Sequence, residues 1–419
     1  MNDQTLLEVL LGEFHRKLQH TTFIVRDAVF PIAENKIKVA VGMRRAGKTS
    51  FIYQTIQALL VKKIPLSRIL YINFEDDRLV PLTREKLAKL VDAFYALYPE
   101  NHDQRCYLFL DEIQNAEDWP MVIRRLQDSK NVEIYLTGSS AKLLSKEIAT
   151  SLRGRSLATE IWPFSFQEFL RAKKITALEK LFDQKKQDQL KKIFHEYLFC
   201  GGFPEVVNYP VETRIKTLQE YIDVVSYRDI IERHQIKNIA LLKYTIFFML
   251  QNYGSSFSIN KFYNDLKTQG YQTSKNVLYD YAHHIEDAFL AFCVGLFDRS
   301  IRKTQTNPKK IYTIDPGLSC ALKINNQYDL GRLFENVVYL DLRRQGCQVY
   351  YYLTKDRYEV DFVAQSFQGK QKLIQVCWDA ADPETMKREE RALVAAQKEL
   401  KMDGELVTLE SYLRNGVIV

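Results

Sequence analysis

Residues 42–49 read GMRRAGKT, a glycine-rich run whose spacing suits the binding of phosphate groups. The run fits the pattern G-x-x-x-x-G-K-[ST], with its fixed positions at Gly42, Gly47, Lys48 and Thr49. Glycines let backbone N–H groups turn toward phosphate oxygens, and a following helix N-terminus adds partial positive charge. The lysine would reach the β- and γ-phosphates, and the hydroxyl would coordinate Mg²⁺. The run therefore predicts a site for ATP and Mg²⁺.

The elements on either side of this run match the strand before it and the helix after it that such a loop needs. Residues 37–41, IKVAV, form a continuous apolar run that is typical of a buried parallel strand. Residues 50–61 carry apolar side chains at helical spacing. Three neighbours complete the predicted nucleotide contacts: Arg45, Ala46 and Ser50. The paired charges of Arg44 and Arg45 leave three roles open, namely phosphate contacts, subunit contacts and solvated charge.

A second acidic motif lies at residues 107–114, YLFLDEIQ, where an apolar strand ends in two carboxylates. Asp111 is predicted to hold Mg²⁺ through water, and Glu112 to polarise the attacking water as a general base. A solvated strand end is the alternative, but the order of the two motifs argues against it. Since nucleotide storage alone needs no glutamate here, the pair favours ATP hydrolysis.

Three further strands are expected to complete a parallel sheet, at residues 68–76, 132–140 and 156–164. Ligands of such sheets gather beyond the carboxyl ends of the strands. Thr137 and Ser139 are therefore candidates to sense the γ-phosphate or to orient water. Simple capping of a turn by these hydroxyls is the alternative.

The segment SLRGRS, residues 151–156, places two arginines around a glycine just before the last of these strands. A guanidinium that contacts the γ-phosphate stabilises the charge that develops in the transition state. Arg155 is the preferred arginine finger or sensor, and Arg153 is the second choice. Surface charge is the alternative, and action within the same subunit or on a neighbour stays open.

The stretch from 256 to 315 follows the order helix, turn, helix and hairpin, which is that of a winged helix-turn-helix. Polar residues at the start of the second helix and basic residues in the hairpin loop would meet DNA. The predicted DNA contacts are Thr273, Ser274, Lys275, Asn276, Arg302, Lys303, Lys309 and Lys310. Contact with a protein is the alternative, since many winged helices never touch DNA.

The C-terminal part carries acids in the layout of the metal nucleases called PD-(D/E)xK. Glu335 lies on an expected helix, and Asp361 lies on an expected strand. In such enzymes two carboxylates hold Mg²⁺ and a lysine helps to activate water. Here the expected acid-x-Lys reads Gln375-Val-Cys, so the second acid is an amide and the lysine is absent. We expect a nuclease-like fold without activity, and we do not favour Lys355 or Lys372 as substitutes.

Length, charge and composition limit the number of domains, the kinds of partner and the cellular compartment that fit this chain. A chain of 419 residues and 49.1 kDa predicts two or three domains, and a net charge of +7 is compatible with nucleic acid without proving it. The nearest candidate for a membrane span, YTIFFML at 244–250, is too short to cross a bilayer. The start of the chain has no basic region typical of a secretory signal. Six scattered cysteines, without a metal-binding spacing, suit apolar packing in a reducing cytoplasm.

Together these segments resemble the bacterial and archaeal AAA-like P-loop ATPases of the ASCE class that pair an N-terminal ATPase core with a C-terminal domain of unknown function. The matching segments are GMRRAGKT, INFEDDR, LFLDEIQ, LTGSSA, LRGR and PFSFQEF, followed by IYTIDPGL, GRLFENVVYLDLRR and EVDFV. The resemblance covers nearly the full chain. It implies ATP hydrolysis, a winged-helix region and a restriction-endonuclease-like tail.

We therefore expect an α/β chain with three domains. These are a parallel-sheet P-loop ATPase core over residues 1–170, a helical and winged helix-turn-helix domain over 171–325, and a small α/β restriction-endonuclease-like domain, nuclease-inactive, over 326–419. The expected function is an ATPase that remodels or translocates duplex or branched DNA as an oligomeric ring, such as a hexamer. A nucleotide-dependent signalling switch that acts on a protein partner is the alternative. No membrane partner is expected.

Overall fold

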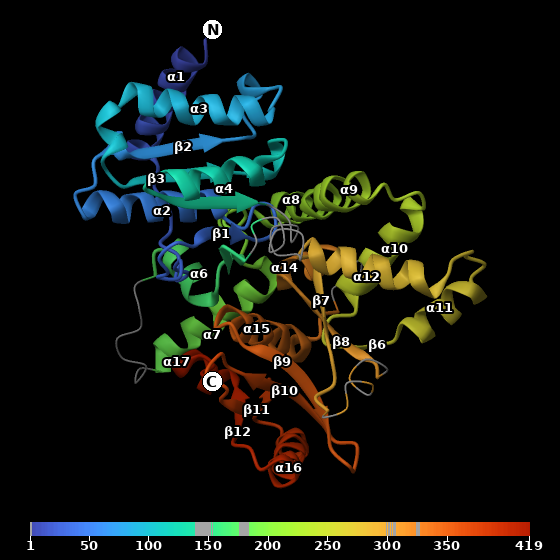
Figure 1. Cartoon of the computed structure of the whole chain (residues 1–419). Coiled ribbons are helices and arrows are strands. Elements are labelled where there is room, and N and C mark those ends of the chain that lie inside the picture. Colours follow the sequence, from blue (N-terminus) through green and yellow to red (C-terminus); the bar gives the residue numbers. More distant parts are fainter. Residues whose placement is uncertain are drawn as a thin grey trace. The chain divides into compact units, whose positions relative to one another are not determined.

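The computed structural model describes residues 2–138, 152, 154–175, 184–298, 300, 302, 304, 307–323 and 327–419. Contacts divide the chain into two compact units, Met1–Trp162 and Pro163–Val419. The first unit is drawn in blue to teal and the second in green to red (Figure 1). The division into three domains stays a prediction.

Unit 1 is built on the predicted parallel sheet. Its strands are β1 (Ile37–Val41), β2 (Ile69–Asn73), β3 (Cys106–Asp111), β4 (Val132–Gly138) and β5 (Ser156–Glu160). All neighbours pair in parallel, in the order β2-β3-β4-β1-β5. Every residue of β1 is buried, as expected of a central strand covered on both faces.

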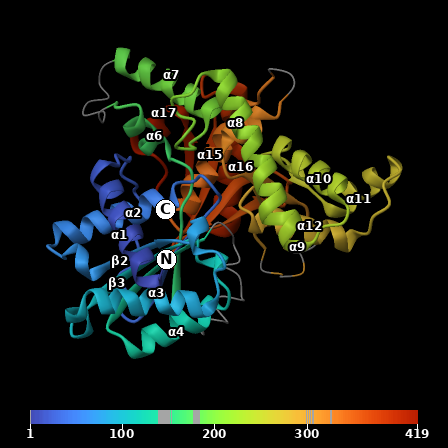
Figure 2. The same ribbon diagram turned by 90° about the horizontal axis from the view of Figure 1, so that it is seen from above.

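Helices cover both faces of this sheet. They are α1 (Asp3–His20), α2 (Lys48–Val61), α3 (Arg84–Leu97) and α4 (Trp119–Ser129), with 3₁₀ turns at Leu66–Arg68, Asp77–Leu79, Pro99–His102 and Ile113–Asn115. Side chains of α1 and α2 share a buried cluster with Tyr71, Phe109 and Tyr135. The chain passes from β1 to the far edge at β2 and then returns strand by strand. Because parallel crossovers are right-handed, this reversal places α3 and α4 on the opposite face (Figure 2).

Unit 2 begins with a helical region. Its helices are α6 (Phe166–Ala172), α7 (Gln184–Cys200), α8 (Val211–Val224), α9 (Glu232–His234), α10 (Ile239–Gln251) and α14 (Pro316–Ala321), and a π-helical turn, Val225–Ile231, joins α8 to α9. Ser165 and Glu168 form a capping box at the start of α6. Among the helices of the described ranges, none is long and apolar enough to cross a membrane.

A three-stranded antiparallel sheet follows within unit 2. Its elements are β6 (Ser256–Phe257), α11 (Ile259–Thr268), α12 (Lys275–Asp287), β7 (Ala291–Val294) and β8 (Lys309–Thr313). The strand order is β6-β8-β7, so β8 is central and is paired on both sides. The expected order of two helices and a hairpin is therefore observed.

The C-terminal sheet of unit 2 has the order β12-β11-β10-β9. Its elements are α15 (Leu330–Arg344), β9 (Gln348–Leu353), β10 (Glu359–Gln365), β11 (Gln371–Cys377), α16 (Pro383–Leu400), β12 (Gly404–Thr408) and α17 (Leu409–Asn415). Helix α16 packs on β10 and β11 through Val360, Leu373 and Leu393 (Figure 1). Helix α15 contacts β8 and β9 as well as β10 and β11, and thus links the two sheets of unit 2.

Candidate functional site

The loop between β1 and α2 has the geometry that the glycine pattern predicts. A Cβ atom on Gly42 would lie 2.1 Å from the backbone oxygen of Ile161, so no other residue fits at this position. Gly47 has φ 97° and caps the N-terminus of α2 in the left-handed region. Lys48 and Thr49 follow as the first residues of the helix, and Ser50 lies in its first turn. The loop therefore aims backbone N–H groups and a helix N-terminus at one place.

The Lys48 ammonium lies inside this loop. Its Nζ is 3.2 Å from the carbonyl oxygen of Gly42 and 3.3 Å from that of Met43. It is also 3.5 Å from Oε1 of Glu112. Two of these acceptors are neutral carbonyls, so a phosphate oxygen would be a stronger partner for the ammonium.

Asp111 is the centre of a buried hydrogen-bond network at the end of β3. Its Oδ2 accepts from Thr49 Oγ1 at 2.8 Å and from the Tyr71 hydroxyl at 2.9 Å. Its Oδ1 accepts from Thr137 Oγ1. Burial raises the pKa of Asp111, and the hydroxyl donors oppose that shift.

The two residues predicted as Mg²⁺ ligands, Thr49 and Asp111, are thus in direct contact. One hydroxyl and one carboxylate are a donor set that fits Mg²⁺, which keeps several waters and takes its other ligands from nucleotide phosphates. Among the described residues, no three His, Cys, Asp or Glu side chains are grouped to hold a metal by themselves.

Glu112 has the chemistry of a general base. Its Oε2 accepts from Gln114 Nε2 at 2.5 Å, and its backbone is left-handed with φ 54°. Burial raises its pKa, but the charge of Lys48, the Gln114 hydrogen bond and the charge of Arg44 lower it more, so the pKa lies below the usual value. The carboxylate is therefore ionised at neutral pH.

Thr137 ties the two acids together. Its hydroxyl donates to Asp111 and accepts from the backbone N–H of Glu112 at 2.9 Å, and the side chain is fully buried. The predicted roles were γ-phosphate sensing, water orientation or turn capping. The observed contacts position the acidic pair, and those three roles stay predictions. Ser139 lies outside the described residues.

Unit 2 contains a second cluster of lysine and carboxylates, which we call the Lys310 cluster: Lys310, Tyr312, Glu335, Glu359, Asp361 and Gln375. Lys310 Nζ lies 2.6 Å from Glu335 Oε1, 2.8 Å from Glu359 Oε1 and 3.2 Å from Asp361 Oδ1. Tyr312, two residues along β8, donates to Glu335 Oε1 at 2.5 Å. The three predicted nuclease-like residues are thus brought together, since Gln375 Oε1 accepts from the backbone N–H of Asp361 at 3.2 Å.

Charges in the Lys310 cluster perturb each other strongly. Burial raises the pKa of Asp361, the neighbouring Glu335 raises it further, and Lys310 opposes the shift. For Lys310 the carboxylates outweigh burial, so its pKa is raised and it stays charged. Neither Lys355 nor Lys372 takes this place: Lys355 N–H contacts Glu399, and Lys372 pairs with Glu405.

Comparison with known proteins agrees with the geometry of unit 1. The sequence model of the AAA domain (AAA_14) matches residues 34–170. Two models of domains of unknown function, DUF8612 and DUF4143, match residues 191–329 and 330–411. The core is therefore that of an AAA-type P-loop ATPase, and such a core implies nucleotide binding.

Relatives cover most of the chain. An uncharacterized protein of Methanocaldococcus jannaschii, MJ1544, is 37% identical over 398 residues, which are 94% of this chain and 86% of that protein. The chain belongs to the family of this archaeal protein. An uncharacterized protein of Haemophilus influenzae is 32% identical over 333 residues, which are 78% of this chain and 79% of that protein.

Two solved structures are more distant. The Walker-type ATPase PABY2304 of Pyrococcus abyssi has a TM-score of 0.44 and 15% identity, over 73% of this chain and 99% of that chain. The ORC1 protein of Aeropyrum pernix, solved in complex with DNA, has a TM-score of 0.31 and 12% identity, over 77% of this chain and 92% of that chain. At these TM-scores neither match supports a conclusion about the partners of this family member.

The structure does not bring Arg155 to the loop of this ATPase core. Arg155 precedes β5, and its carbonyl oxygen accepts from Ile37 N–H at the start of β1, whereas the loop follows the end of β1. A five-residue strand separates its two ends by roughly 13 Å. The Arg155 side chain pairs with Asp128. Contact with nucleotide on another copy stays a prediction, and Arg153 lies outside the described residues.

The two arginines inside the loop differ in their surroundings. Arg44 pairs with Glu75 at 3.2 Å, both partly exposed, and Arg45 has a left-handed backbone with φ 66°. The carbonyl oxygen of Ala46 accepts from Arg26 NH1 at 2.9 Å. The roles of Arg44 and Arg45 toward nucleotide stay predictions.

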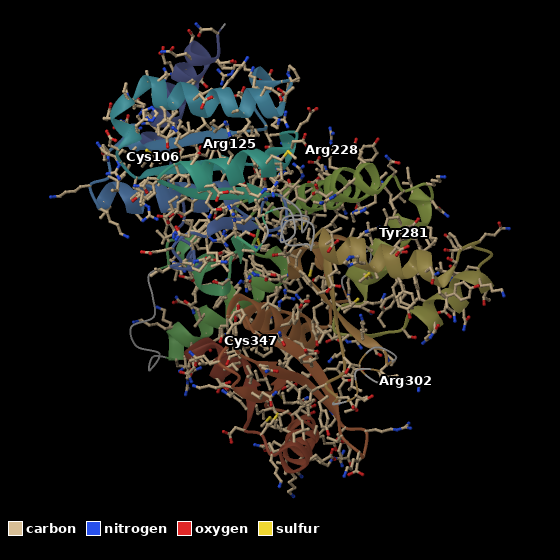
Figure 3. All side chains as sticks on the ribbon, in the orientation of Figure 1. Cys106, Arg125, Arg228, Tyr281, Arg302 and Cys347 are labelled. Atoms are coloured by element: carbon tan, nitrogen blue, oxygen red, sulfur yellow. The ribbon has the colours of Figure 1, made fainter. Side chains whose placement is uncertain are left out.

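The predicted DNA contacts fall into two groups. Thr273 precedes α12, Ser274 caps it by accepting from Val277 N–H, and Lys275 and Asn276 are exposed at its first turn. In the second group Arg302 is exposed between β7 and β8 (Figure 3), Lys309 is half-buried, and Lys303 lies outside the described residues.

Lys310 must be removed from the predicted DNA contacts. Its side chain is only 3% exposed because its ammonium is directed into the carboxylates of the Lys310 cluster. Lys309 and Lys310 are neighbours on a strand, and consecutive residues of a strand face opposite ways. The sequence shows two adjacent basic residues, but only the strand geometry shows that their side chains lie on opposite faces.

Sequence reasoning missed Tyr71 and Arg26. Tyr71 is one of several buried aromatic residues on the inner strands, and its hydroxyl is directed at Asp111. No spacing pattern connects it to residue 111. Arg26 lies far before the glycine-rich loop and is buried, which is rare for arginine. All six cysteines are free thiols, of which only Cys293 is not fully buried.

Proposed function

We propose that this chain hydrolyses ATP at the loop of unit 1 and uses the cycle to remodel or translocate duplex or branched DNA as an oligomeric ring. One observation carries the hydrolysis: the Lys48 ammonium, the Thr49 hydroxyl and the carboxylates of Asp111 and Glu112 converge in one buried network. These are the groups that phosphoryl transfer to water needs, namely charge on the phosphates, Mg²⁺ ligands and a base.

The chain's own residues have distinct parts in this chemistry. Lys48 and the backbone N–H groups of the loop would bind the phosphates, and Thr49 and Asp111 would hold Mg²⁺, which shields phosphate charge when bound. Glu112 would accept the proton of the attacking water, because its pKa is lowered and it is ionised. Thr137 positions both acids.

The proposed DNA contact rests on the order of elements α10, β6, α11, α12, β7 and β8, which is that of a winged helix. The first turn of α12 is exposed and presents Lys275 and Asn276 beside the helix N-terminus. Such a turn suits either base edges or phosphates. Arg302 adds an exposed charge in the connection between β7 and β8.

A protein-directed switch is the second candidate, because one observation favours it. Lys310, one of the charges expected in the DNA-binding loop, is taken up by the carboxylates of its own unit. A loop with fewer free charges binds phosphates less well. The switch would show slow turnover, retained nucleotide and no response to DNA.

We also propose that the nuclease-like region does not cleave DNA. In this region Gln375 stands where the second acid is expected, and the Lys310 ammonium already contacts Glu335 and Asp361. A divalent cation would have to displace this buried ammonium. Metal-dependent cleavage of DNA by the wild type, lost in Asp361→Ala, would contradict this part of the proposal.

The experiment that separates the two candidate functions is the steady-state ATPase rate with single-stranded, duplex and branched DNA. For the DNA-directed ATPase we expect stimulation that falls steeply between about 50 and 200 mM salt, because phosphate contacts release counterions. The variant Lys275→Ala should lose part of this stimulation and keep its basal rate. A rate that is the same with every DNA at low salt would favour the switch.

A further inference from the structure

The buried guanidinium of Arg26 joins two parts of unit 1 that are far apart in sequence. NH1 donates to the carbonyl oxygen of Ala46 at 2.9 Å, and NH2 donates to that of Trp162 at 2.5 Å. Ala46 lies in the phosphate loop, and Trp162 is the last residue of unit 1 before the chain continues into unit 2 at Pro163. Arg26 itself is only 5% exposed.

The backbone of Arg26 is held on the helix that follows the loop. Its N–H donates to Gln54 Oε1 at 2.7 Å, and its carbonyl oxygen accepts from Gln54 Nε2 at 3.0 Å. Gln54 lies on α2, which starts at Lys48. Because its backbone is held on α2 and its buried guanidinium is hydrogen-bonded to two carbonyl oxygens, Arg26 can act as a fixed reference for both carbonyls.

The hydrogen bond to Ala46 controls a donor of the phosphate site. In a planar trans peptide unit the C=O and the N–H point in opposite directions. Because the Ala46 oxygen points at Arg26, the N–H of Gly47, in the same peptide unit, points away from Arg26. This N–H is one of the loop donors that phosphate binding needs. Arg26 therefore acts on the phosphate site through the orientation of one peptide unit.

The other end of the loop touches the same exit segment. Ile161 N–H donates to the Val41 oxygen at 2.7 Å, and the Ile161 oxygen lies where a Cβ of Gly42 would be. The segment 161–162 thus contacts the loop directly at Gly42 and, through Arg26, at Ala46. If phosphate binding shifts the loop backbone, the shift would change the contacts of segment 161–162 at both places.

We propose that Arg26 is a positioning residue that couples the state of the phosphate loop to the exit segment 161–162, and through the covalent chain to unit 2. The proposal rests on nucleotide binding at this loop. Arg26 orients the Gly47 N–H and makes the exit segment respond to the nucleotide. A lysine could donate to one of the two carbonyls but not to both in the same fixed geometry.

The chain offers a direct reporter, because it has three tryptophans and one of them is Trp162. In a parent variant with Trp119→Phe and Trp378→Phe, the emission of Trp162 should change when ADP or a non-hydrolysable ATP analogue binds with Mg²⁺. In the Arg26→Gln variant of this parent, nucleotide should still bind in a separate filter assay. The Trp162 response should be lost, and kcat should fall about tenfold with little change in KM.

Two further variants make the test specific. Arg84→Gln removes an exposed arginine that pairs with Glu85 on α3, and it should keep the full response and rate. Arg26→Lys, which keeps the charge, should bind nucleotide and show a weakened change in Trp162 emission. This variant replaces Arg26→Gln in the test if Arg26→Gln does not fold.

The outcomes separate the inference from the function on which it rests. A full Trp162 response in both Arg26 variants would overturn the coupling, and so would a parent that binds nucleotide without any response. A parent that binds no nucleotide in the filter assay would instead overturn the proposed function.

Discussion

The buried lysines Lys48 and Lys310, each beside carboxylates, differ in how they are held. In unit 1, Lys48 stands at the start of a helix and contacts two carbonyl oxygens and one carboxylate. In unit 2, Lys310 stands in the central strand β8 and contacts three carboxylates. The first ammonium would gain by moving to a phosphate, and the second is already neutralised. A lysine near acids therefore does not by itself identify a catalytic site.

The acids of the two clusters also differ in the direction of their pKa shifts. Glu112 has a lowered pKa because Lys48, Gln114 and Arg44 together outweigh burial. Asp361 has a raised pKa because burial and Glu335 outweigh Lys310. Glu112 is therefore ionised at neutral pH, as a group that accepts a proton must be, whereas Asp361 keeps its proton there.

The largest expected effect concerns Lys48→Ala. Removal of the ammonium takes away the charge that meets the phosphates, so nucleotide binding and turnover should both fall below detection. Filter binding of labelled ATP and phosphate release measure the two losses. Lys62→Ala, at the far end of α2, is a matched control that should behave as wild type.

The next effect is expected for Glu112→Gln. The amide keeps the size of the side chain but cannot accept a proton, so ATP should stay bound while turnover falls about 10²–10⁴-fold. A single-turnover assay on preloaded protein measures this split. Normal turnover in this variant would exclude Glu112 as the base.

Lys310→Met should act on stability and not on ATP turnover. The change leaves the Glu335 carboxylate buried without its cation, which costs about 3–5 kcal/mol in the free energy of unfolding. Denaturant titration of the full chain followed by fluorescence would show an early loss of unit 2. The neighbouring Lys309→Met should cost less, since Lys309 is only half-buried and the ion pairs of Glu335 and Asp361 are made with Lys310. Equal stability of the two variants would contradict the central role of Lys310.

An effect is also expected in the pH dependence of stability. The pKa of Asp361 is raised from its unfolded value near 3.8 to about 8, so the folded chain holds a proton that the unfolded chain has lost. Its contribution is therefore present below about pH 4 and is lost as pH rises toward 8, by at most about 1.4 kcal/mol per pH unit. Asp361→Asn should flatten this part of the stability profile. If the slope of stability against pH is unchanged in Asp361→Asn, a group of the Lys310 cluster other than Asp361 carries the raised pKa.

The smallest effect is expected for Tyr71→Phe. The variant loses one donor to the buried Asp111, a loss of about 1 kcal/mol, so the Mg²⁺ concentration for half-maximal ATPase rate should rise about fivefold. Tyr107→Phe, on the neighbouring strand β3, is the control that leaves Asp111 untouched. Identical Mg²⁺ curves for the two variants would remove Tyr71 from the site.

Predictions from the sequence were best where the functional residues lie together in one segment of the chain. The glycine loop and the Asp111-Glu112 pair each lie in one segment with its own strand, so local patterns place them. Arg155 shows what such reasoning overlooked within one chain: it precedes a strand parallel to β1, and residues before parallel strands gather at the edge opposite to the loop, so its predicted role remains open only toward another copy. That argument was available from the sequence, whereas the contact with Asp128 was not.

The sequence alone determined that a phosphate loop and an acidic strand end belong to one α/β core, because strand, loop and helix are consecutive and their spacing is set by backbone geometry. It also placed Glu335, Asp361 and Gln375 on neighbouring elements. Only the tertiary structure decided which cation meets which acid. Lys310 turns inward to Glu335 and Asp361, Tyr71 reaches Asp111, and Arg26 reaches Ala46 and Trp162. These contacts join residues that are far apart in sequence, and burial of their polar groups requires partners that only the folded chain supplies.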